Sequence, residues 1–244
     1  MQLKTEIYHI SAGLPREVTF AFVSDLHDGD PTPVLDAIAA QDVDAVLVGG
    51  DVIHDHAHYQ RGIEFLAKSA ARYKTFCCIG NHERRYRGDF ASLVASSGAV
   101  LLDDAMVEYA GVVIGGLSSG CTAVDDAPHR PPLLWRFQKT PAPQRAFLSH
   151  FAAQKGFKLL LCHHPEYWEC YIRDLDVDLT LSGHAHGGQW RIFGRGVFAP
   201  GQGLFPRYTS GLYHERLLVS RGVGNPHCIP RICNSPMVAI IHIT

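Results

Sequence analysis

The chain of 244 residues contains no apolar run that approaches the roughly 20 residues needed to span a bilayer. Its first residues, MQLKTEIYHISAG, include neither an apolar core of signal-peptide length nor a twin arginine. Internal repeats and low-complexity linkers are absent as well. We therefore expect a single domain over residues 1–244 that has no membrane span and lies in the cytoplasm.

The sequence also lacks an excess of charge of either sign. Its 22 lysines and arginines nearly balance its 24 aspartates and glutamates, and the formal net charge is −2. This balance gives no electrostatic support for binding to nucleic acid or for nonspecific attachment to an anionic membrane. The seven cysteines include no C-x-x-C pair, so neither a disulfide framework nor a zinc knuckle is indicated. We expect reduced, mostly buried thiols.

Apolar runs of strand length alternate with amphipathic stretches of helical length, a pattern typical of an α/β domain. The runs that predict strands are VTFAFV, DAVLVG, KTFCCIG, GVVIGGL, KLLLCH, DLTLSG, RLLVSRG and VAIIHI. The stretches that predict helices are PTPVLDAIAAQ, QRGIEFLAKSAARY, DFASLVASSG, PAPQRAFLSHFAAQ and PEYWECYIRDL. Two irregular regions remain, residues 118–132 and 187–208, and loops of this length in a compact domain tend to be functional. We interpret the first as a flap.

Polar side chains follow five of the predicted strands at the point where each strand ends. They are Asp25 and His27, then Asp51, then Asn81 and His82, then His163 and His164, and finally His184 and His186. In open α/β sheets, ligands bind beyond the carboxyl ends of the strands, so we expect these side chains to converge on one cleft. Glycines directly before Asp51, Asn81 and His184 allow close approach of the backbone there.

The gathered groups comprise two carboxylates, one carboxamide and four or five imidazoles. This mixture suits borderline divalent ions such as Mn, Fe and Zn, whereas calcium prefers ligands that are all oxygen. The alternative is a chance assembly of structural histidines. That alternative explains one motif but not five in order, so the sequence predicts a metal site.

The order of the motifs, D-x-H, GGD, GNHE, H-x-P and GHAHGG, resembles the calcineurin-like metallophosphoesterase superfamily. These motifs span Asp25 to Gly188, about two-thirds of the chain. The tail APGQGLFPRYTSGLY…LLVSRGVGNPHCIPRI is similar to the bacterial YkuE/YaeI-type branch. The resemblance implies a four-layer α-β-β-α sandwich, in which two mixed β-sheets are flanked by helices.

The resemblance further implies a role for each residue at the strand ends. Asp25, His27 and His186 would hold the first metal ion, Asn81, His163 and His184 would hold the second, and Asp51 would bridge the two. His82 would be a catalytic residue that faces the substrate phosphate and is not a ligand. The implied protein is a dinuclear metal-dependent phosphoesterase that hydrolyses a phosphodiester or pyrophosphate bond through a metal-bridging hydroxide.

The implied cofactors are two divalent ions among Mn, Fe and Zn, with manganese favoured in vitro, and the implied partner is a phosphorylated small molecule. A broad-specificity phosphomonoesterase is the alternative within the same enzyme class. A non-catalytic metal-binding scaffold is the alternative outside it. Scaffold relatives typically lose ligands or the catalytic histidine, whereas this chain has all of them. The oligomeric state stays open.

Three arginines, Arg84, Arg85 and Arg87, follow His82 directly. One interpretation is a solvated surface. The other is a cationic rim, with Arg84 and Arg85 as substrate-binding residues for a second anionic group. A pyrophosphate keeps such a group outside the metal pair, and a guanidinium binds it through two parallel hydrogen bonds.

Two further histidine-containing stretches receive structural interpretations. We expect IHDHAHY, residues 53–59, to be a helix entry that is capped by Asp55 rather than a metal tract. We expect His164 to be a neighbour of the metal site and not a ligand.

Overall fold

The computed structural model describes residues 2–120, 142–225 and 230–244. Most of the predicted flap and the first residue of the predicted helix at residues 141–154 lie outside the described residues, as do Cys121 and Cys228. The other five cysteines are free thiols; Cys77, Cys78 and Cys162 are buried, and Cys170 and Cys233 are exposed. Within the described ranges, no helix has the length and apolarity needed to cross a membrane.

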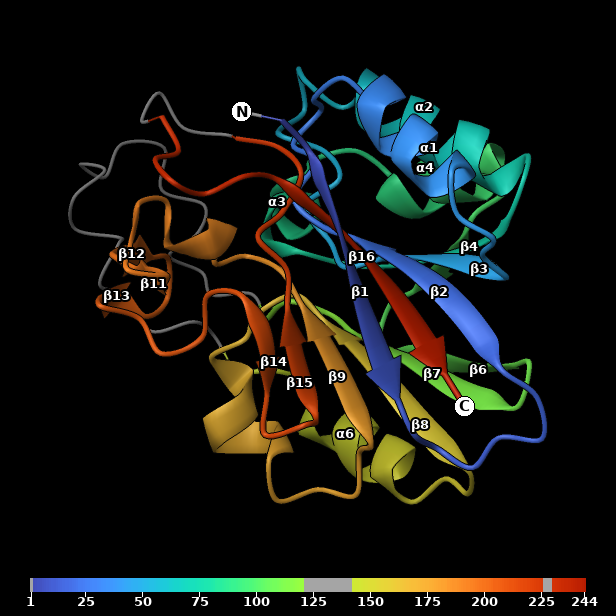
Figure 1. Cartoon of the computed structure of the whole chain (residues 1–244). Helices are drawn as coiled ribbons and strands as arrows, with labels where there is room; N and C mark the ends of the chain where they lie inside the picture. Colours follow the sequence, from blue (N-terminus) through green and yellow to red (C-terminus); the bar gives the residue numbers. More distant parts are fainter. Residues whose placement is uncertain (1, 121–141, 226–229) are drawn as a thin grey trace.

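Two six-stranded mixed sheets pack face to face at the centre of the molecule (Figure 1). The first has the order β1-β16-β2-β3-β4-β5, with the bounds Lys4–Ile10, Met237–Ile243, Val18–Val23, Ala45–Val48, Lys74–Cys78 and Val100–Leu102. The second has the order β14-β15-β9-β8-β7-β6, with the bounds Gly211–Tyr213, Leu217–Val219, Leu179–Ser182, Phe157–Cys162, Val112–Leu117 and Ala105–Tyr109. Neighbours from β2 to β5, and from β15 to β7, run parallel.

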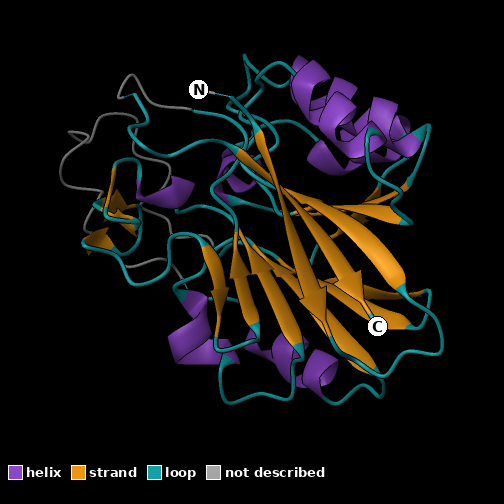
Figure 2. Ribbon diagram, in the orientation of Figure 1, coloured by secondary structure: helices purple, strands orange, loops and turns teal. Residues whose placement is uncertain are grey.

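Helices cover the outer face of each sheet (Figure 2). The helices α1, α2 and α4, with the bounds Thr32–Ala39, Gln60–Ala70 and Phe90–Ser97, lie over the first sheet. The helix α6, Arg145–Ala152, and the π-helical turn η1, Trp168–Ile172, lie under the second. The short helix α3, Asn81–Arg85, follows β4 directly. The predicted four-layer α-β-β-α sandwich is confirmed.

The alternation of side chains along the strands explains how both faces of each sheet are buried. In β2, Phe20 and Phe22 belong to the apolar cluster between the sheets, whereas Ala21 and Val23 belong to the cluster under the helices. Successive side chains of a strand point to opposite faces, so a strand buried on both faces must be apolar at every position. This is why VTFAFV is a continuous apolar run and why its predicted bounds match β2.

Some local predictions were wrong. The helix α2 begins at Gln60 with Tyr59 as its N-cap, and the Asp55 carboxylate instead accepts the N–H groups of Ala57 and His58, each over 2.8 Å. Asp55 therefore caps a turn upstream of the helix. The stretch PEYWECYIRDL forms η1 rather than an α-helix, because the Arg173 N–H reaches back five residues to the Trp168 carbonyl.

The glycine-rich region that begins at His186 forms a 3-10 turn and two small hairpins. The turn η2 covers His186–Gly188. The first hairpin pairs β10, Arg191–Ile192, with β11, Arg195–Gly196. The second pairs β12, Phe198–Ala199, with β13, Gly203–Leu204. Both project from one edge of the sandwich (Figure 1).

Candidate metal centre

The carboxyl ends of β2, β3 and β4 in the first sheet meet those of β8 and β9 in the second, and the polar residues that follow them converge. Among these residues, Asp25, His27, Asp51, His184 and His186 all have positive φ angles, between 46° and 62°. Residues other than glycine rarely adopt this conformation, which costs of order 1–3 kcal/mol each. Strained backbone that gathers at one place in this way indicates a functional site.

Close backbone packing brings the strand ends together. A Cβ atom at Gly183 would lie 2.5 Å from Oδ2 of Asp25, and one at Gly50, where φ is +85°, would lie 2.7 Å from the backbone nitrogen of Gly80. No residue with a side chain fits at either position without displacement. The expectation that these glycines permit close approach is confirmed.

A first group contains Asp25, His27 and His186, all buried. Nε2 of His186 lies 3.2 Å from Nε2 of His27 and 3.5 Å from Oδ1 of Asp25. One ligand atom from each residue lies within 4.8 Å of the others. Two imidazole nitrogens that face each other beside a carboxylate can direct both lone pairs at one cation, so the group fits a divalent ion.

A second group contains Asp51, His163 and His184, which are also buried and have ligand atoms within 4.8 Å of one another. Nε2 of His163 lies 3.1 Å from Oδ2 of Asp51. The same Oδ2 atom lies 3.8 Å from Nε2 of His27 in the first group. The Asp51 carboxylate therefore belongs to the second group and also lies close to the first.

Asn81 and His82 begin helix α3 beside the second group. The side-chain oxygen of Asn81 is buried and has no hydrogen-bond partner among the described residues. A buried polar atom normally has a partner, so this oxygen fits the role of a metal ligand. The backbone N–H of His82 donates to Oδ1 of Asp51 over 2.9 Å. The His82 side chain is 23% exposed, and its Nδ1 contacts the carbonyl oxygen of His54. His82 thus lies at the accessible edge of the site.

Burial and mutual charge shift the pKa values in this site in opposite directions. Burial lowers the pKa of His27 and of His184 well below the usual range, which leaves neutral imidazoles that can act as ligands. Burial also raises the pKa of Asp25. It would raise that of Asp51, but nearby imidazoles, His163 first, hold the pKa of Asp51 well below its usual range. The ionised form of Asp51 is therefore favoured, and this carboxylate attracts positive charge to the site.

Glu83 is a buried residue that the sequence reasoning did not single out. Its carboxylate accepts hydrogen bonds from the N–H groups of Gly80, Asp51 and Ile53 over 2.8, 2.7 and 3.1 Å. It ties the residues after β3 to those after β4. The signal was present, because Glu83 is the last letter of GNHE and stands three residues after the N-cap of α3, as in a capping box.

The C-terminal segment contributes Arg231 and Asn234, which the sequence reasoning also missed. Nη2 of Arg231 lies 3.3 Å from Nδ1 of His186, and its Nη1 donates to the Arg221 carbonyl over 2.7 Å. The Asn234 amide donates to the His186 carbonyl over 2.7 Å. Both residues are buried and lie more than 40 positions from His186 in the sequence, so no local pattern indicates their contact with it.

Two further groups adjoin the predicted ligands. His164, Glu166 and His184 have ligand atoms within 4.8 Å of one another, as have His27, His54 and His82. Oε1 of Glu166 lies 3.3 Å from Nδ1 of His164 and 3.9 Å from Nε2 of His184. His164 is thus a close neighbour of the site, and that it is not a ligand stays a prediction.

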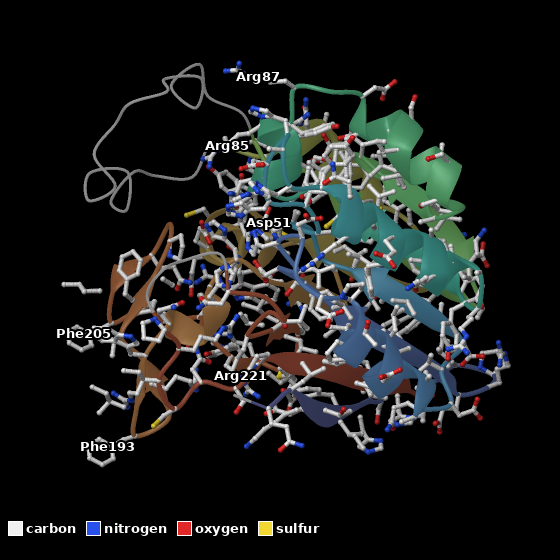
Figure 3. The ribbon with its side chains drawn as sticks, turned by 90° about the horizontal axis from the view of Figure 1, so that it is seen from above. Asp51, Arg85, Arg87, Phe193, Phe205 and Arg221 are labelled. Carbon is white, nitrogen blue, oxygen red and sulfur yellow. The ribbon has the colours of Figure 1, made fainter. Side chains whose placement is uncertain are left out.

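The three arginines after His82 differ in their surroundings. Arg84 is half-buried, and its Nε donates to the Ser119 carbonyl over 2.9 Å. Arg85 and Arg87 are exposed, and Arg87 extends outward from the molecule (Figure 3).

Comparison with known proteins shows the family to which this chain belongs. The family model of the calcineurin-like phosphoesterases matches residues 18–188. The chain is 30% identical over 240 residues to phosphodiesterase YaeI of Escherichia coli (strain K12). The matched region covers 91% of this chain and 80% of that protein. It is 26% identical over 206 residues to the uncharacterized metallophosphoesterase YkuE of Bacillus subtilis (strain 168). That matched region covers 81% of this chain and 66% of that protein.

Among solved structures, the chain is similar to phosphopantetheinyl hydrolase (PptH) from Mycobacterium tuberculosis, with a TM-score of 0.43 and 17% identity over 69% of this chain and 83% of that one.

The calcineurin-like phosphoesterase family implies divalent metal cofactors and a phosphorylated substrate. The described residues include histidine and aspartate groups that could bind such ions. The predicted family is confirmed, and the chain belongs to the calcineurin-like phosphoesterases.

Proposed function

We propose that this protein is a dinuclear hydrolase that cleaves a phosphodiester or pyrophosphate bond. The observation that carries the proposal is the position of Asp51, whose Oδ2 lies 3.1 Å from Nε2 of His163 in one group and 3.8 Å from Nε2 of His27 in the other. A carboxylate that reaches both groups gives two cations a common anion and lets them bind side by side.

The predicted ligands keep their assignments in this proposal. Asp25, His27 and His186 hold one ion, Asn81, His163 and His184 hold the other, and Asp51 contributes to both. Two divalent ions bound there would supply a water of lowered pKa and positive charge for the phosphoryl oxygens. Residues 1–244 act as one domain, because the apolar cluster between the sheets draws on strands from both halves of the chain.

His82 acts on the substrate from the accessible edge. When its Nδ1–H donates to the His54 carbonyl, the ring is held with Nε2 turned away from that oxygen. Nε2 lies 3.9 Å from Oδ2 of Asp51, beside the place where a phosphoryl group would bind. From there a protonated imidazole stabilises charge on the phosphoryl oxygens or donates a proton to the leaving oxygen.

Arg84 and Arg85 are the proposed binding residues for a second anionic group. Both belong to α3, the helix that begins with Asn81 and His82. The hydrogen bond from Nε of Arg84 to the Ser119 carbonyl restrains that guanidinium. The phosphodiesterase name of YaeI supports a diester over a monoester.

The test is a substrate comparison with protein loaded with manganese, zinc or iron. The substrates are bis(p-nitrophenyl) phosphate, a uridine diphosphate sugar and p-nitrophenyl phosphate. We expect kcat/KM for the diester or the pyrophosphate to exceed that for the monoester by at least about tenfold. A preference for the monoester would reassign the protein as a phosphomonoesterase. Failure to hydrolyse any substrate with any of the metals would contradict the enzymatic proposal.

A further inference from the structure

Exposed apolar side chains gather on the two small hairpins and beside them. Among the described residues, eight large apolar side chains are exposed, and only Ile7 and Leu212 lie elsewhere. The other six, here called the hairpin patch, are Trp190, Ile192, Phe193, Leu204, Phe205 and Ile232. Such a concentration marks an interaction surface, whereas single exposed apolar residues need no explanation.

Two phenylalanines form the outermost points of the hairpin patch. Phe193 is fully exposed, at 102%, and Phe205 is 79% exposed. Both side chains project outward from the edge of the molecule (Figure 3). Neither ring gains stability from burial in the folded chain, so packing does not explain why these positions are aromatic.

The backbone at both phenylalanines makes the choice of residue more unusual. Phe193 has a φ of 48° and Phe205 a φ of 51°. Phe193 and Gly194 form the two-residue loop between Ile192 and Arg195, a position where asparagine, aspartate or glycine is favoured. A bulky residue with positive φ is strained, and full exposure offers no compensation within the chain. We take this as a sign that the rings serve a contact outside the molecule.

The hairpin patch is held firmly to the fold. The Trp190 indole N–H donates to the Pro230 carbonyl over 3.0 Å, and Nη1 of Arg191 donates to the Gly187 carbonyl over 2.9 Å. The Val197 N–H donates to the Gly188 carbonyl over 3.1 Å. The last two bonds attach the first hairpin to Gly187 and Gly188, in the loop that carries His186.

The charged side chains within the segment that forms the hairpins are all arginines. Residues 187–214 contain Arg191, Arg195 and Arg207 and no aspartate or glutamate, although the whole chain has a net charge of −2. Arg207 pairs with Glu169 over 2.6 Å, while Arg195 is exposed beside the tip of the first hairpin. Electrostatic attraction at physiological salt acts over about 8 Å, so this local charge counts for more at the surface than the net charge does.

We propose that the hairpin patch docks onto the surface of an anionic lipid bilayer, with Phe193 and Phe205 in the interfacial layer and Arg195 among the headgroups. Aromatic rings that project outward, with an exposed arginine beside one of them, are suited to this interface. A bilayer accepts two projecting rings without a shaped pocket, which a protein partner would have to provide. Docking turns the side of the molecule that carries the loop of His186 toward the membrane, and it does not depend on which bond the centre cleaves.

Vesicle co-sedimentation of the full chain tests the proposal. The probes are phosphatidylcholine vesicles and vesicles that also contain phosphatidylglycerol as the minor component. We expect binding to the mixed vesicles to be about fivefold stronger, as one arginine near the surface would give. The double variant Phe193→Ser/Phe205→Ser should lower binding at least about tenfold. Arg195→Glu should abolish the preference for anionic vesicles.

The matched control is Ile7→Ser, which removes an exposed apolar side chain from β1 and should leave binding unchanged. A second readout is the Phe193→Trp variant, whose fluorescence should shift to the blue and be quenched by brominated lipids. Circular dichroism confirms that the variants fold. Hydrolysis of soluble substrates should be the same in the serine double variant, so failure to bind membranes and failure of the proposed reaction are distinguishable.

Three results would overturn the proposal. The first is a wild-type protein that does not bind the mixed vesicles. The second is a serine double variant that binds them as well as the wild type does. The third is light scattering that shows a dimer of the wild type, which the double variant loses, because the patch would then be covered by a second copy.

Discussion

The carboxylate of Glu83 accepts a hydrogen bond from the backbone N–H of Asp51 over 2.7 Å. It also accepts the N–H groups of Gly80 and Ile53, so one buried side chain binds the backbone on both sides of the site. Asp51 has a φ of 53°, a left-handed conformation that residues other than glycine adopt uncommonly. Glu83 therefore fixes the backbone from which the Asp51 carboxylate reaches both candidate metal positions.

We expect Glu83→Gln to weaken metal binding without changing any proposed ligand. The amide keeps one acceptor oxygen and turns an NH2 group toward a backbone donor. Loss of a hydrogen bond that orients a ligand typically lowers metal affinity about 10–100-fold, and a buried donor left unpaired costs about 1–3 kcal/mol of unfolding free energy. Calorimetric titration with manganese and chemical denaturation measure the two effects.

Glu64→Gln is the matched control for that prediction. Glu64 lies on α2, where its carboxylate pairs with Lys68 over 2.7 Å on an exposed surface. The same chemical change there should alter neither metal affinity nor stability appreciably. Metal affinity in Glu83→Gln equal to that of the control would show that Glu83 does not position Asp51.

Metal stoichiometry tests the role of Asp51 itself. Reconstituted wild-type protein should contain about two transition-metal ions per chain, and a chelator should abolish activity that manganese then restores. Asp51→Asn removes the anion that both ions would share, so we expect it to lose at least one of them. Elemental analysis provides the measurement, with Asp55→Asn as a control at a nearby, exposed aspartate. At most one tightly bound ion in the wild type would rule out the dinuclear assignment.

The layers of the fold and the convergence of the site were predictable because they rest on local patterns. Strands that are buried on both faces must be continuous apolar runs. The apolar run VTFAFV therefore predicts the strand β2. The polar residue that ends each run then lies where parallel strands end together. Asp25 and Asp51 both lie close to His27 for this reason.

Features that depend on tertiary contacts were not predictable. The edge strand β1 is exposed or half-buried throughout, and it is defined by its parallel pairing with β16 at the other end of the chain. Arg231 contacts His186 only because the C-terminal segment folds back over the site. The two small hairpins have strands of two residues each, too short for any periodic pattern.

Leaving-group dependence tests the role of His82. If His82 acts as a general acid, His82→Ala should lower kcat about 10²–10⁴-fold for a substrate with an alkyl leaving group. The loss should be clearly smaller for p-nitrophenolate, which leaves without protonation. The control is His58→Ala, whose side chain is 65% exposed. Equal losses for both substrates would restrict His82 to charge stabilisation.

Arg84 and Arg85 test the preference for a substrate with two phosphates. Arg84 donates through Nε to the Ser119 carbonyl over 2.9 Å, and we propose that its guanidinium binds a phosphate outside the metal pair. We expect Arg84→Ala or Arg85→Ala to raise KM for a pyrophosphate substrate at least about tenfold, or about 1.4 kcal/mol. An aryl phosphodiester lacks the second phosphate and should be much less affected. Arg87→Ala, at a residue that extends outward beyond the end of α3, should affect neither substrate. Equal effects on both substrates, or none, would mean that these arginines form a solvated surface, and the case for a pyrophosphate would lose its main support.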